Sequence, residues 1–436
     1  MISEDIIMVV CADLANQVRG KGFPASERET RVRRGVGWVP TNSLITCFNT
    51  IADGPFGSLG DLLLIPDERA EVRVAFDDGS APEHFMIGDI RTSDGTSWNF
   101  CPRSILQSAL ADLLSEAGVQ LKVAFEHEFW SVADEAVPWS SFGLGSFRHS
   151  AAFGRTILAA LRSAGLKPDT FLPEYGQDQY EVTVAPSMGL RAADECVIVR
   201  EMVRAVAKRT GRKVSFSPVV DEGTGNGLHI HISLVDRDGV PCTYDANSPS
   251  RLNPVAGSFF GGIRKYLPSL LALTASSVVS YERLQPHRWS AAFNNFAEND
   301  REAALRVCPV IGLEGFTAAS QFHVEYRAAD ATANPYLQLA VLARAGLQGI
   351  RDNEPAPTPT TGDLSLLANG QLAKIGVVRL PSDLQSALDL LDNERLLRSW
   401  FPGEFVDVFL AHKTGEIAFL QDKDAADIRR MYADAY

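Results

Sequence analysis

Three short apolar stretches of this chain each carry two polar side chains that stand two residues apart. The pairs are Glu126 and Glu128 in VAFEHEF, His229 and His231 in GLHIHISL, and Glu325 and Arg327 in FHVEYR. Because side chains at i and i+2 leave a β-strand on the same face, each pair is predicted to point to one side while its apolar neighbours pack on the other. A fourth segment, LPEYGQDQYEVTV, places Glu174, Gln179 and Glu181 in the same style. Strands with such polar inner faces would line a cavity.

Neighbouring strands of this kind would bring six metal-ligating side chains to one site: Glu126, Glu128, Glu174, Glu181, Glu325 and His229. Two carboxylates about 4 Å apart repel by about 4 kcal/mol at an effective dielectric of about 20, so five would not stay ionised together without cations. Carboxylate oxygens with a single imidazole suit Mg²⁺ or Mn²⁺ better than Zn²⁺. A lone Glu-x-Glu is usually the solvated face of a strand, and only the combination of pairs favours a metal site.

The bulk composition sets limits on the partners of the chain. Its 436 residues exceed the usual size of one hydrophobic core, so two domains are expected. With 41 basic and 54 acidic residues the net charge is −13, which argues against a nucleic-acid partner or an anionic membrane surface. Six scattered cysteines without a CxxC spacing are typical of reduced, mostly buried thiols. The N-terminus does not have the pattern of a signal or transit peptide, and no apolar run is long enough to span a bilayer, so a cytoplasmic protein is expected.

The elements that must position these side chains can be placed along the chain. Residues 5–80 alternate strand-like runs, among them SLITCF, GDLLLIPD and AEVRVAF, with turn-rich links, which predicts a small, mostly β domain. Pro102 opens an amphipathic helix, SILQSALADLLSEAG, that Gly118 ends. We therefore predict a first domain over residues 1–100 and a catalytic domain over residues 101–436. The stretch 134–150 is rich in small residues, proline and aromatics and is predicted to be a loop.

The order of strands and helices indicates the fold class. They interleave without the regular spacing of a parallel βα sheet, and the chain has neither a GxGxxG nor a Walker-type loop. We predict an α+β protein whose catalytic domain has a curved antiparallel sheet flanked by helices. The concave face of this sheet would hold the metals.

The motifs resemble those of the glutamine synthetase family over nearly the full length of the chain. They are, in order, FEHEF, EYGQDQYE, GNGLHIHISL, SYERLQP, REAALR and EYRAADATANPYLQLA. Each is weak alone, but six in the family's order are highly specific. The resemblance implies a β-grasp-like N-terminal domain before a glutamine synthetase-type catalytic domain. It also implies an ATP-dependent ligase that forms γ-glutamyl phosphate from glutamate and lets an amine displace the phosphate, in a homo-oligomeric ring, usually a dodecamer, with sites completed between subunits.

The resemblance also implies individual roles. Glu128, Glu174 and Glu181 match the ligands of the cation near the amino acid, and Glu126, His229 and Glu325 those of the cation near the nucleotide phosphates. The implied ATP contacts are His231, Ser233, Arg301 and Arg306, the implied glutamate contacts are Gly225, Arg283 and Arg327, and the groups nearest the chemical step are Arg301, Arg327 and Glu325. Guanidinium groups suit carboxylate and phosphate because they bind both in a bidentate manner. Taken singly, each arginine would more often be part of a solvated surface or an ordinary ion pair.

Two departures from the family pattern concern the nucleophile. Family members that use ammonium carry an Asp-Gly-Ser-Ser loop in the small domain of the neighbouring subunit, whereas ITCFNTIADGPFGS places Thr46 or Cys47 near that acid, with Asp53 as a possible substitute. The glutamate that follows SYxRLxP in the family is Trp289 here. Losing two carboxylates removes groups that would hold a small cation, while an indole offers a flat apolar wall. An organic amine is therefore the predicted nucleophile, as in the branch of the family that makes γ-glutamylamides, and ammonium with Trp289 as a core aromatic is the alternative.

Other departures concern the nucleotide side, where the family's asparagine before Gly225 is Thr224 and a common arginine is His323. A catalytically inactive structural relative and a guanidino kinase-type phosphotransferase are the other classes to consider. The retention of all six metal ligands with Arg283 and Arg327 argues against an inactive relative, and the small N-terminal domain with the NPYLQLA helix favours the ligase.

Overall fold

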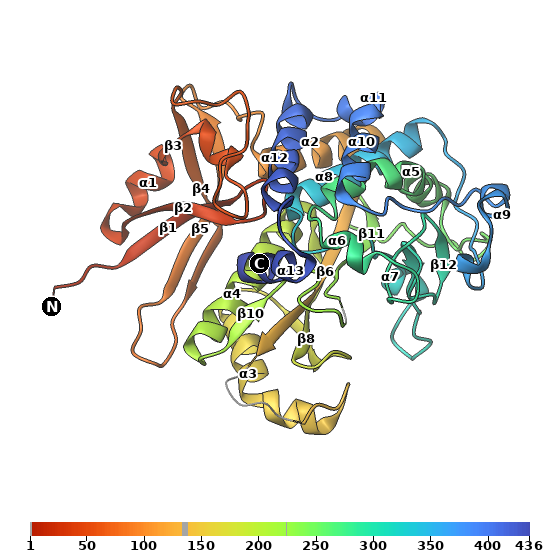
Figure 1. Cartoon of the computed structure of the whole chain (residues 1–436), viewed down its shortest axis with the longest axis horizontal. Helices are drawn as coiled ribbons and strands as arrows, with labels where there is room; N and C mark the ends of the chain where they lie inside the picture. Colours follow the sequence, from red (N-terminus) through yellow and green to blue (C-terminus); the bar gives the residue numbers. More distant parts are fainter. Residues whose placement is uncertain (1, 133–137, 224) are drawn as a thin grey trace.

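The computed structural model of the chain describes residues 2–132, 138–223 and 225–436. It contains a five-stranded and a nine-stranded sheet, each with helices packed against it. Figure 1 shows the N-terminal sheet, in red and orange, to one side of the larger catalytic region. Within the described ranges, no helix combines the length and the apolar character needed to cross a bilayer.

The N-terminal sheet has the strand order β2-β1-β5-β4-β3. Its strands are β1 (Ile6–Ala12), β2 (Val18–Pro24), β3 (Val36–Trp38), β4 (Leu62–Val74) and β5 (Glu83–Thr92), and the helix α1 (Arg28–Arg34) packs against β4. The central pair β1 and β5 is parallel and the other pairs are antiparallel. The small β domain expected from the sequence is therefore present.

Two details of this domain differ from the prediction. GDLLLIPD and AEVRVAF are parts of the single strand β4, because its pairing with β5 shifts register between Pro66 and Glu71 and absorbs the polar residues between the two runs. SLITCF is not a strand. It begins in the 3-10 turn η2 (Pro40–Leu44) and continues into a turn in which the Thr46 amide donates to the carbonyl of Thr50 at 2.8 Å.

The catalytic sheet follows the order β12-β13-β14-β11-β6-β8-β7, with β9 and β10 also paired to β6. The strands are β6 (Val119–Val132), β7 (Pro168–Pro173), β8 (Gln179–Val184), β9 (Ser187–Met188), β10 (Lys213–Ser215), β11 (Leu228–Asp236), β12 (Phe296–Glu298), β13 (Leu305–Val307) and β14 (Val324–Tyr326). Every pair is antiparallel except β12 with β13. This confirms the predicted α+β class with a largely antiparallel sheet.

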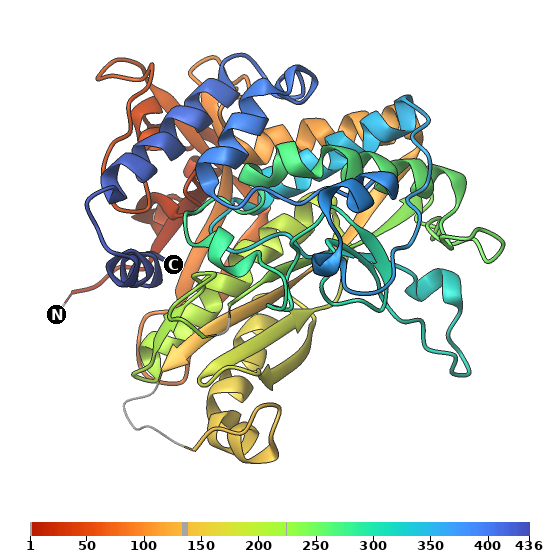
Figure 2. The same cartoon turned by 45° about the vertical axis from the view of Figure 1, so that its right-hand side comes forward.

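One face of this sheet is buried under long helices: α2 (Pro102–Asp112), α4 (Gly189–Arg209), α5 (Pro254–Leu270) and α8 (Pro335–Arg351). α8 packs against the other three, and α4 also contacts β6. Figure 2 shows these helices layered over the strands. α8 begins where expected, because Asn334 caps it by accepting from the amides of Tyr336 and Leu337, and α2 runs through a π turn, η3 (Leu113–Ala117), to the left-handed Gly118.

The prediction of a loop over residues 134–150 is partly wrong. Residues 133–137 lie outside the described residues, but α3 (Leu144–Ser163) begins well before the expected end of the loop. Phe153, Ile157 and Leu161 recur at helical spacing and are buried, and the hydroxyl of Ser146 accepts from the Ser140 amide just before the helix. Residues 144–150 of this stretch therefore form the first turns of an amphipathic helix, whereas Trp139 and Phe142 precede it.

Further helices complete the chain: α6 (Ser280–Arg283), α7 (Ala318–Gln321), α9 (Asn369–Lys374), α10 (Leu384–Asn393), α11 (Arg395–Arg398), α12 (Phe405–Leu420) and α13 (Ala425–Ala435), with the 3-10 turns η1 (Ala25–Glu27), η4 (Leu271–Leu273) and η5 (Leu364–Leu366). The C-terminal Tyr436 returns to the N-terminal domain, where its hydroxyl donates to the carbonyl of Ala15 at 2.6 Å. This contact fixes α13 beside the site described below.

Candidate active site

The register of four strands brings the predicted polar pairs together. His229 on β11 stands opposite Glu126 on β6, and Glu128 stands opposite Glu181 on β8. Along β6 every second residue from Val119 to Phe129 is buried against the helices, so Glu126 and Glu128 share the other face. The i, i+2 pattern and the cross-strand register are thus enough to gather acids from segments far apart in sequence.

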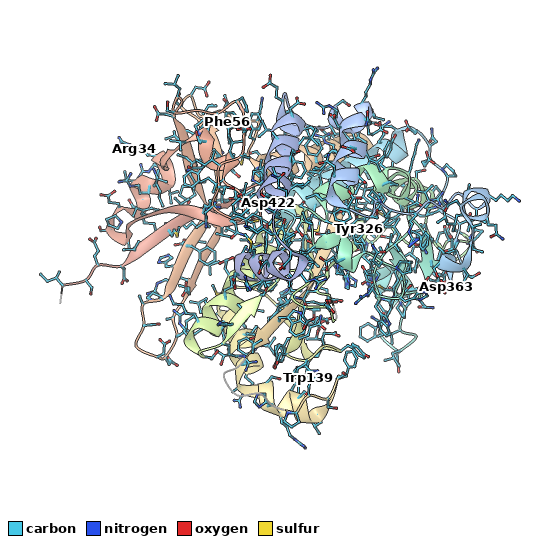
Figure 3. All side chains as sticks on the ribbon, in the orientation of Figure 1. Arg34, Phe56, Trp139, Tyr326, Asp363 and Asp422 are labelled. Atoms are coloured by element: carbon cyan, nitrogen blue, oxygen red, sulfur yellow. The ribbon has the colours of Figure 1, made fainter. Side chains whose placement is uncertain are left out.

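The same rule applies at the other edge of the site. Glu325 on β14 stands opposite His231 on β11 and opposite Arg306 on β13. Tyr326 faces the opposite way and is fully buried, and Figure 3 labels it in the catalytic region. Its hydroxyl is paired with that of Thr274 at 2.8 Å in the core.

The ligand atoms lie at distances suited to cations. The Nδ1 atom of His229 is 2.9 Å from Glu126 Oε1, 3.4 Å from Glu325 Oε1 and 3.7 Å from Glu128 Oε1. Two triads have ligand atoms within 4.8 Å of one another: Glu126 with His229 and Glu325, and Glu126 with Glu128 and Glu181. We call these five residues the carboxylate cluster. Gly227 makes room for the imidazole, because a Cβ there would lie 2.5 Å from His229 Nε2.

The first triad is the set predicted for the nucleotide-side cation. The second shares Glu128 and Glu181 with the set predicted for the other cation, but contains Glu126 in place of Glu174. Glu174 follows β7, and its carboxylate accepts from the Tyr175 amide at 2.9 Å while interacting with Glu181. It therefore lies beside the cluster, on the side of Glu181.

Burial and mutual repulsion shift the pKa values of these acids. Burial and the charges of Glu126, Glu128 and Glu174 raise the pKa of Glu181 to about 10, and burial and the charge of Glu128 raise the pKa of Glu174 to about 7. Glu325 is the opposite case: burial opposes its ionisation, but His229 and Arg327 lower its pKa to about 2. All of these acids can ionise together only if added positive charge offsets their repulsion. Oxygen ligands with one imidazole fit a hard divalent cation.

Two arginines hold Glu325 from both sides. Arg327 donates through Nη1 to Glu325 Oε1, and Arg306 donates through Nη1 to Glu325 Oε2 at 2.7 Å. Arg327 also donates through Nη2 to the main-chain carbonyl of Trp289 at 3.0 Å. The structure does not bring Arg301 into this cluster, because its side chain is exposed in the turn before β13.

Gly225 and Arg283 contact each other in the wall of a cavity. Arg283 is buried and donates to the carbonyl of Ala329 at 2.7 Å. A Cβ on Gly225 would lie 2.6 Å from the Cγ of Arg283, so this close approach requires glycine. Both residues line a cavity of about 370 Å³, together with Val219, Asp221, Glu222, Gly223, Glu282, Arg288 and Arg429.

Sequence reasoning missed the charged lining of this cavity. Asp221 and Glu222 are separated from the GNGLHIHISL motif only by Gly223 and Thr224 and could have been found as acids beside a predicted site. Arg429 lies on α13, some 150 residues after Glu282, to which it donates at 2.7 Å. Its local sequence does not identify Arg429 as a cavity residue, because it reaches the cavity only where the C-terminal helices fold back.

The residues predicted for the amine pocket lie in different environments. Trp289 is 66% exposed and has a left-handed backbone with φ of 53°, so its indole is outside the core of this chain. Cys47 is buried in a cluster with Val219, Tyr432 and Tyr436, and burial raises the pKa of its thiol well above the ordinary value. Thr46 is also buried, whereas Asp53 is exposed.

On the nucleotide side, His231 is hydrogen-bonded through Nε2 to Glu126 Oε2 at 3.2 Å. Ser233 is two residues further along the same face, where its hydroxyl donates to the Lys122 carbonyl at 3.3 Å. Cys308 is buried beside His231 and His323. Burial opposes ionisation of its thiol, but hydrogen bonds with the two imidazoles lower its pKa below the ordinary value. Thr224 lies outside the described residues.

Comparison with known families agrees with this site. Residues 3–98 match the model described as "Glutamine synthetase N-terminal domain", and residues 99–432 match "Glutamine synthetase, catalytic domain". The chain therefore belongs to the glutamine synthetase family, and it is an ATP-dependent ligase that forms carbon–nitrogen bonds. The resemblance inferred from the six motifs is confirmed.

Individual relatives span the whole chain. The chain is 31% identical over 442 residues to Gamma-glutamylpolyamine synthetase GlnA3 of Streptomyces coelicolor, covering 99% of this chain and 93% of that protein. It is 29% identical over 444 residues to Type-1 glutamine synthetase 1 of Dictyostelium discoideum, covering 95% and 86%. A crystal structure of a novel glutamine synthase homolog superposes with a TM-score of 0.93, 36% identity and coverage of 100% and 99%. A GmaS/ADP complex shares the fold, with a TM-score of 0.83, 23% identity and coverage of 99% and 97%.

Proposed function

We propose that this protein joins the γ-carboxylate of glutamate to a primary amine that carries an organic substituent, through a γ-glutamyl phosphate. The observation that carries this proposal is Trp289. Its indole is exposed where the resemblance places the acid of ammonium-using members, and its carbonyl is held by Arg327, the arginine assigned to the γ-carboxylate. An apolar surface at that point favours a carbon-bearing nucleophile over a small, strongly hydrated cation.

The similarity to a γ-glutamylpolyamine synthetase supports an organic amine, and ammonium is the alternative that it does not favour. The cavity beside Gly225 adds a further argument. Arg429 donates to Glu282 at 2.7 Å and to the exposed Glu222 at 3.4 Å, and Arg283 is reserved for glutamate, so the exposed carboxylates of Asp221 and Glu222 are only partly offset by this arginine. We assign to them the attraction of the protonated amine, and of a second ammonium group if the substrate is a polyamine.

The carboxylate cluster, together with Glu174 beside it, would hold two Mg²⁺ or Mn²⁺ ions, with Glu126, His229 and Glu325 on the nucleotide side and Glu128, Glu181 and Glu174 on the glutamate side. When bound, these ions neutralise phosphate oxygens during in-line transfer. The chain's own residues orient the substrates: Arg283 binds the α-carboxylate, Gly225 leaves room for the amino group, and Arg327 aligns the γ-carboxylate. Glu325 accepts from both Arg306 and Arg327 and holds the two guanidinium groups in place for contact with anionic groups, which lowers the entropic cost of alignment.

The reaction then proceeds in two steps. A γ-carboxylate oxygen attacks the terminal phosphorus of ATP, the bond to the bridging oxygen breaks, and ADP leaves. The amine nitrogen, after losing a proton, attacks the acyl carbon, and the carbon–oxygen bond breaks to release phosphate. We assign Arg306 and the exposed Arg301 to the phosphoryl group, with His231 and Ser233 beside the nucleotide.

We further propose a cytoplasmic homo-oligomeric ring in which the N-terminal domain, residues 1–100, completes the site of a neighbouring subunit. Asp53 is exposed and accessible for that role, whereas Cys47 is buried within its own chain. Sedimentation of the protein at several concentrations measures the assembly. A monomer that is fully active would refute the shared site.

The amine is identified by measuring phosphate release with glutamate, ATP and a panel of amines that includes ammonium, alkylamines, polyamines and aromatic amines. We expect an organic amine to give the highest kcat/KM. If ammonium gives the highest value, the argument from Trp289 is wrong.

A further inference from the structure

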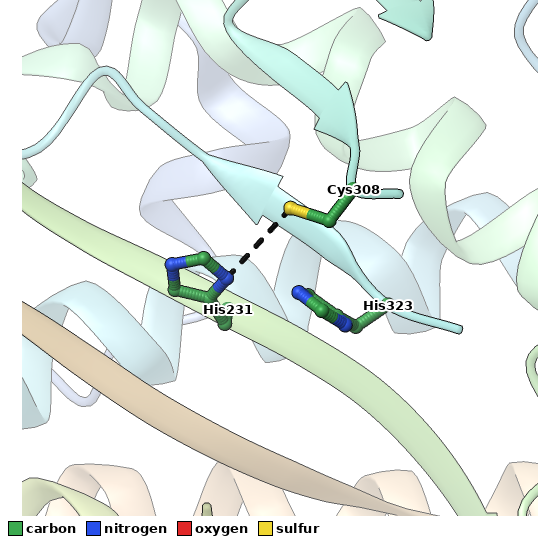
Figure 4. Close-up of side chains that lie close together, drawn as sticks. All are labelled: His231, Cys308 and His323. Carbon is green, nitrogen blue, oxygen red and sulfur yellow. Dashed lines mark hydrogen bonds between the residues drawn. The ribbon is translucent and has the colours of Figure 1, made fainter. Parts of the chain in front are cut away.

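A second group of metal-ligating side chains lies beside the carboxylate cluster and is chemically different from it. It consists of His231 on β11, Cys308 just after β13 and His323 just before β14, which we call the Cys-His cluster. Its ligand atoms lie within 4.8 Å of one another, and Figure 4 shows the three side chains converging from separate segments. The Sγ atom of Cys308 is 3.9 Å from Nδ1 of His231, and the two imidazole centroids are 5.0 Å apart.

The hydrogen bonds around the two imidazoles leave one nitrogen of each ring for this cluster. Nε2 of His231 must donate to Glu126 Oε2, because a carboxylate only accepts, so Nδ1 is the nitrogen that faces Cys308. Nδ1 of His323 must donate to the carbonyl of Gln321, 2.6 Å away, so Nε2 is its remaining nitrogen. Metal-bound histidines are typically held in this way, with the other ring nitrogen donating to a carboxylate or a carbonyl.

The distances are close to those of a coordinated ion. Zinc bonds of about 2.3 Å to sulfur and about 2.05 Å to nitrogen, at a tetrahedral angle, place the two ligand atoms about 3.6 Å apart. The Cys308 to His231 distance of 3.9 Å needs a contraction of only a few tenths of an ångström. A thiolate with two imidazoles suits Zn²⁺ and disfavours Mg²⁺, which takes oxygen ligands.

We infer that His231, Cys308 and His323 bind a Zn²⁺ ion, or a similar thiophilic divalent ion, with a fourth position open to water or an anionic oxygen. The ion takes the place of the thiol proton of Cys308 and of any proton on the facing nitrogens. The site is separate from the carboxylate cluster, since the two share no ligand, but Glu126 connects them as the acceptor for His231. This inference does not depend on the identity of the amine.

The other explanation of the Cys-His cluster is a thiol–imidazole hydrogen bond without a metal. The chain offers a matched control for it, because Cys196 and His127 form such a contact at 3.4 Å on the helix-covered side of the sheet. Within the described residues, that pair is in no group of three metal-ligating side chains. Cys196→Ala therefore removes a buried Cys–His contact without touching a proposed site.

The test uses the full-length protein after treatment with a chelator. Zn²⁺ is titrated in competition with a chromophoric chelator, with excess Mg²⁺ present to fill the carboxylate cluster. Co²⁺ is then used as a spectroscopic substitute, since a cysteine ligand gives a sulfur-to-cobalt charge-transfer band. We expect one zinc equivalent per chain that Mg²⁺ does not displace, and a thiolate band with cobalt. Cys308→Ala and His323→Gln should weaken zinc binding by about 100-fold or more, and Cys196→Ala should not.

Mn²⁺ binding reports whether each variant keeps the neighbouring site. Glu181→Gln should weaken Mn²⁺ binding and keep the cobalt–thiolate band, while His323→Gln should do the reverse. The inference is overturned if no zinc is retained in excess Mg²⁺, if the cobalt complex has no thiolate band, or if His323→Gln binds zinc like the wild type. His323 is only half-buried, so this variant remains informative if Cys308→Ala does not fold.

Discussion

Glu181→Gln should stabilise the metal-free protein and remove most of its stabilisation by metal. The pKa of Glu181 is raised from its ordinary value of 4.5 to about 10, by burial first and then by Glu126, Glu128 and Glu174. In the folded metal-free protein this carboxyl therefore holds a proton that the unfolded chain has lost above about pH 4.5. Folding must take up that proton, so stability falls as the pH rises from about 4.5 toward 10.

The size of the effect follows from linkage. Each pH unit across this window costs at most about 1.4 kcal/mol, so at pH 7, about 2.5 units above the ordinary pKa, the cost reaches about 3.5 kcal/mol at most. Glutamine is neutral in both states and removes this cost. In the wild type, by contrast, Mn²⁺ at about 100 times its dissociation constant adds about 2.7 kcal/mol of stability, which needs the carboxylate.

The assay is thermal unfolding of both proteins, with and without Mn²⁺, from pH 5 to pH 9. We expect the variant to be more stable than the wild type without metal, with a gap that widens as the pH rises, and to respond little to Mn²⁺. Glu29→Gln is the control, because Glu29 is 89% exposed on α1 and should change neither quantity. A Glu181→Gln protein that is less stable without metal, or that responds normally to Mn²⁺, would refute the reasoning.

Three further substitutions test the substrate side. Trp289→Glu should raise kcat/KM for ammonium relative to organic amines, measured by phosphate release, and an unchanged ratio would count against the amine pocket. Arg327→Lys keeps the charge but loses the planar fork that reaches both Glu325 and the Trp289 carbonyl, so kcat/KM for glutamate should fall about 100-fold, and a fall below 3-fold would contradict this role. Gly225→Ala should raise the KM for glutamate at least about 10-fold by displacing Arg283, whereas Gly57→Ala, with no atom within 4 Å of the added Cβ, should not.

Much of this site could be predicted because β-strands have a period of two. The alternation of Glu126, His127 and Glu128 identifies which side chains share a face, and burial in β6 follows that alternation residue by residue. The amphipathic helix opened by Pro102 and ended by Gly118 was also predictable, because its apolar period and its stop signals are local features of the sequence.

What could not be predicted depends on contacts between distant segments. The joining of two expected strands into β4 requires the bulge opposite β5, a strand that lies later in the chain and had no separate prediction. The exposure of Arg301 also has no local signature, because it depends on what packs above it. Arg429 reaches the cavity only because α13 folds back along the N-terminal domain.

The two histidines of β11 show how one strand can serve two kinds of coordination chemistry. His229 and His231 leave the same face, so the strand alone does not distinguish them. The pairing with neighbouring strands distinguishes them. His229 lies opposite Glu126 on β6, and its Nδ1 atom is 3.4 Å from Glu325. His231 lies opposite Glu325, but its free nitrogen faces Cys308. Carboxylates around the first ring favour a hard cation, and sulfur beside the second favours a soft one. Since Glu126 bonds to both rings, a charge bound at either position changes the field at the other, so occupancy of one site should change the affinity of the other by the same factor in both directions.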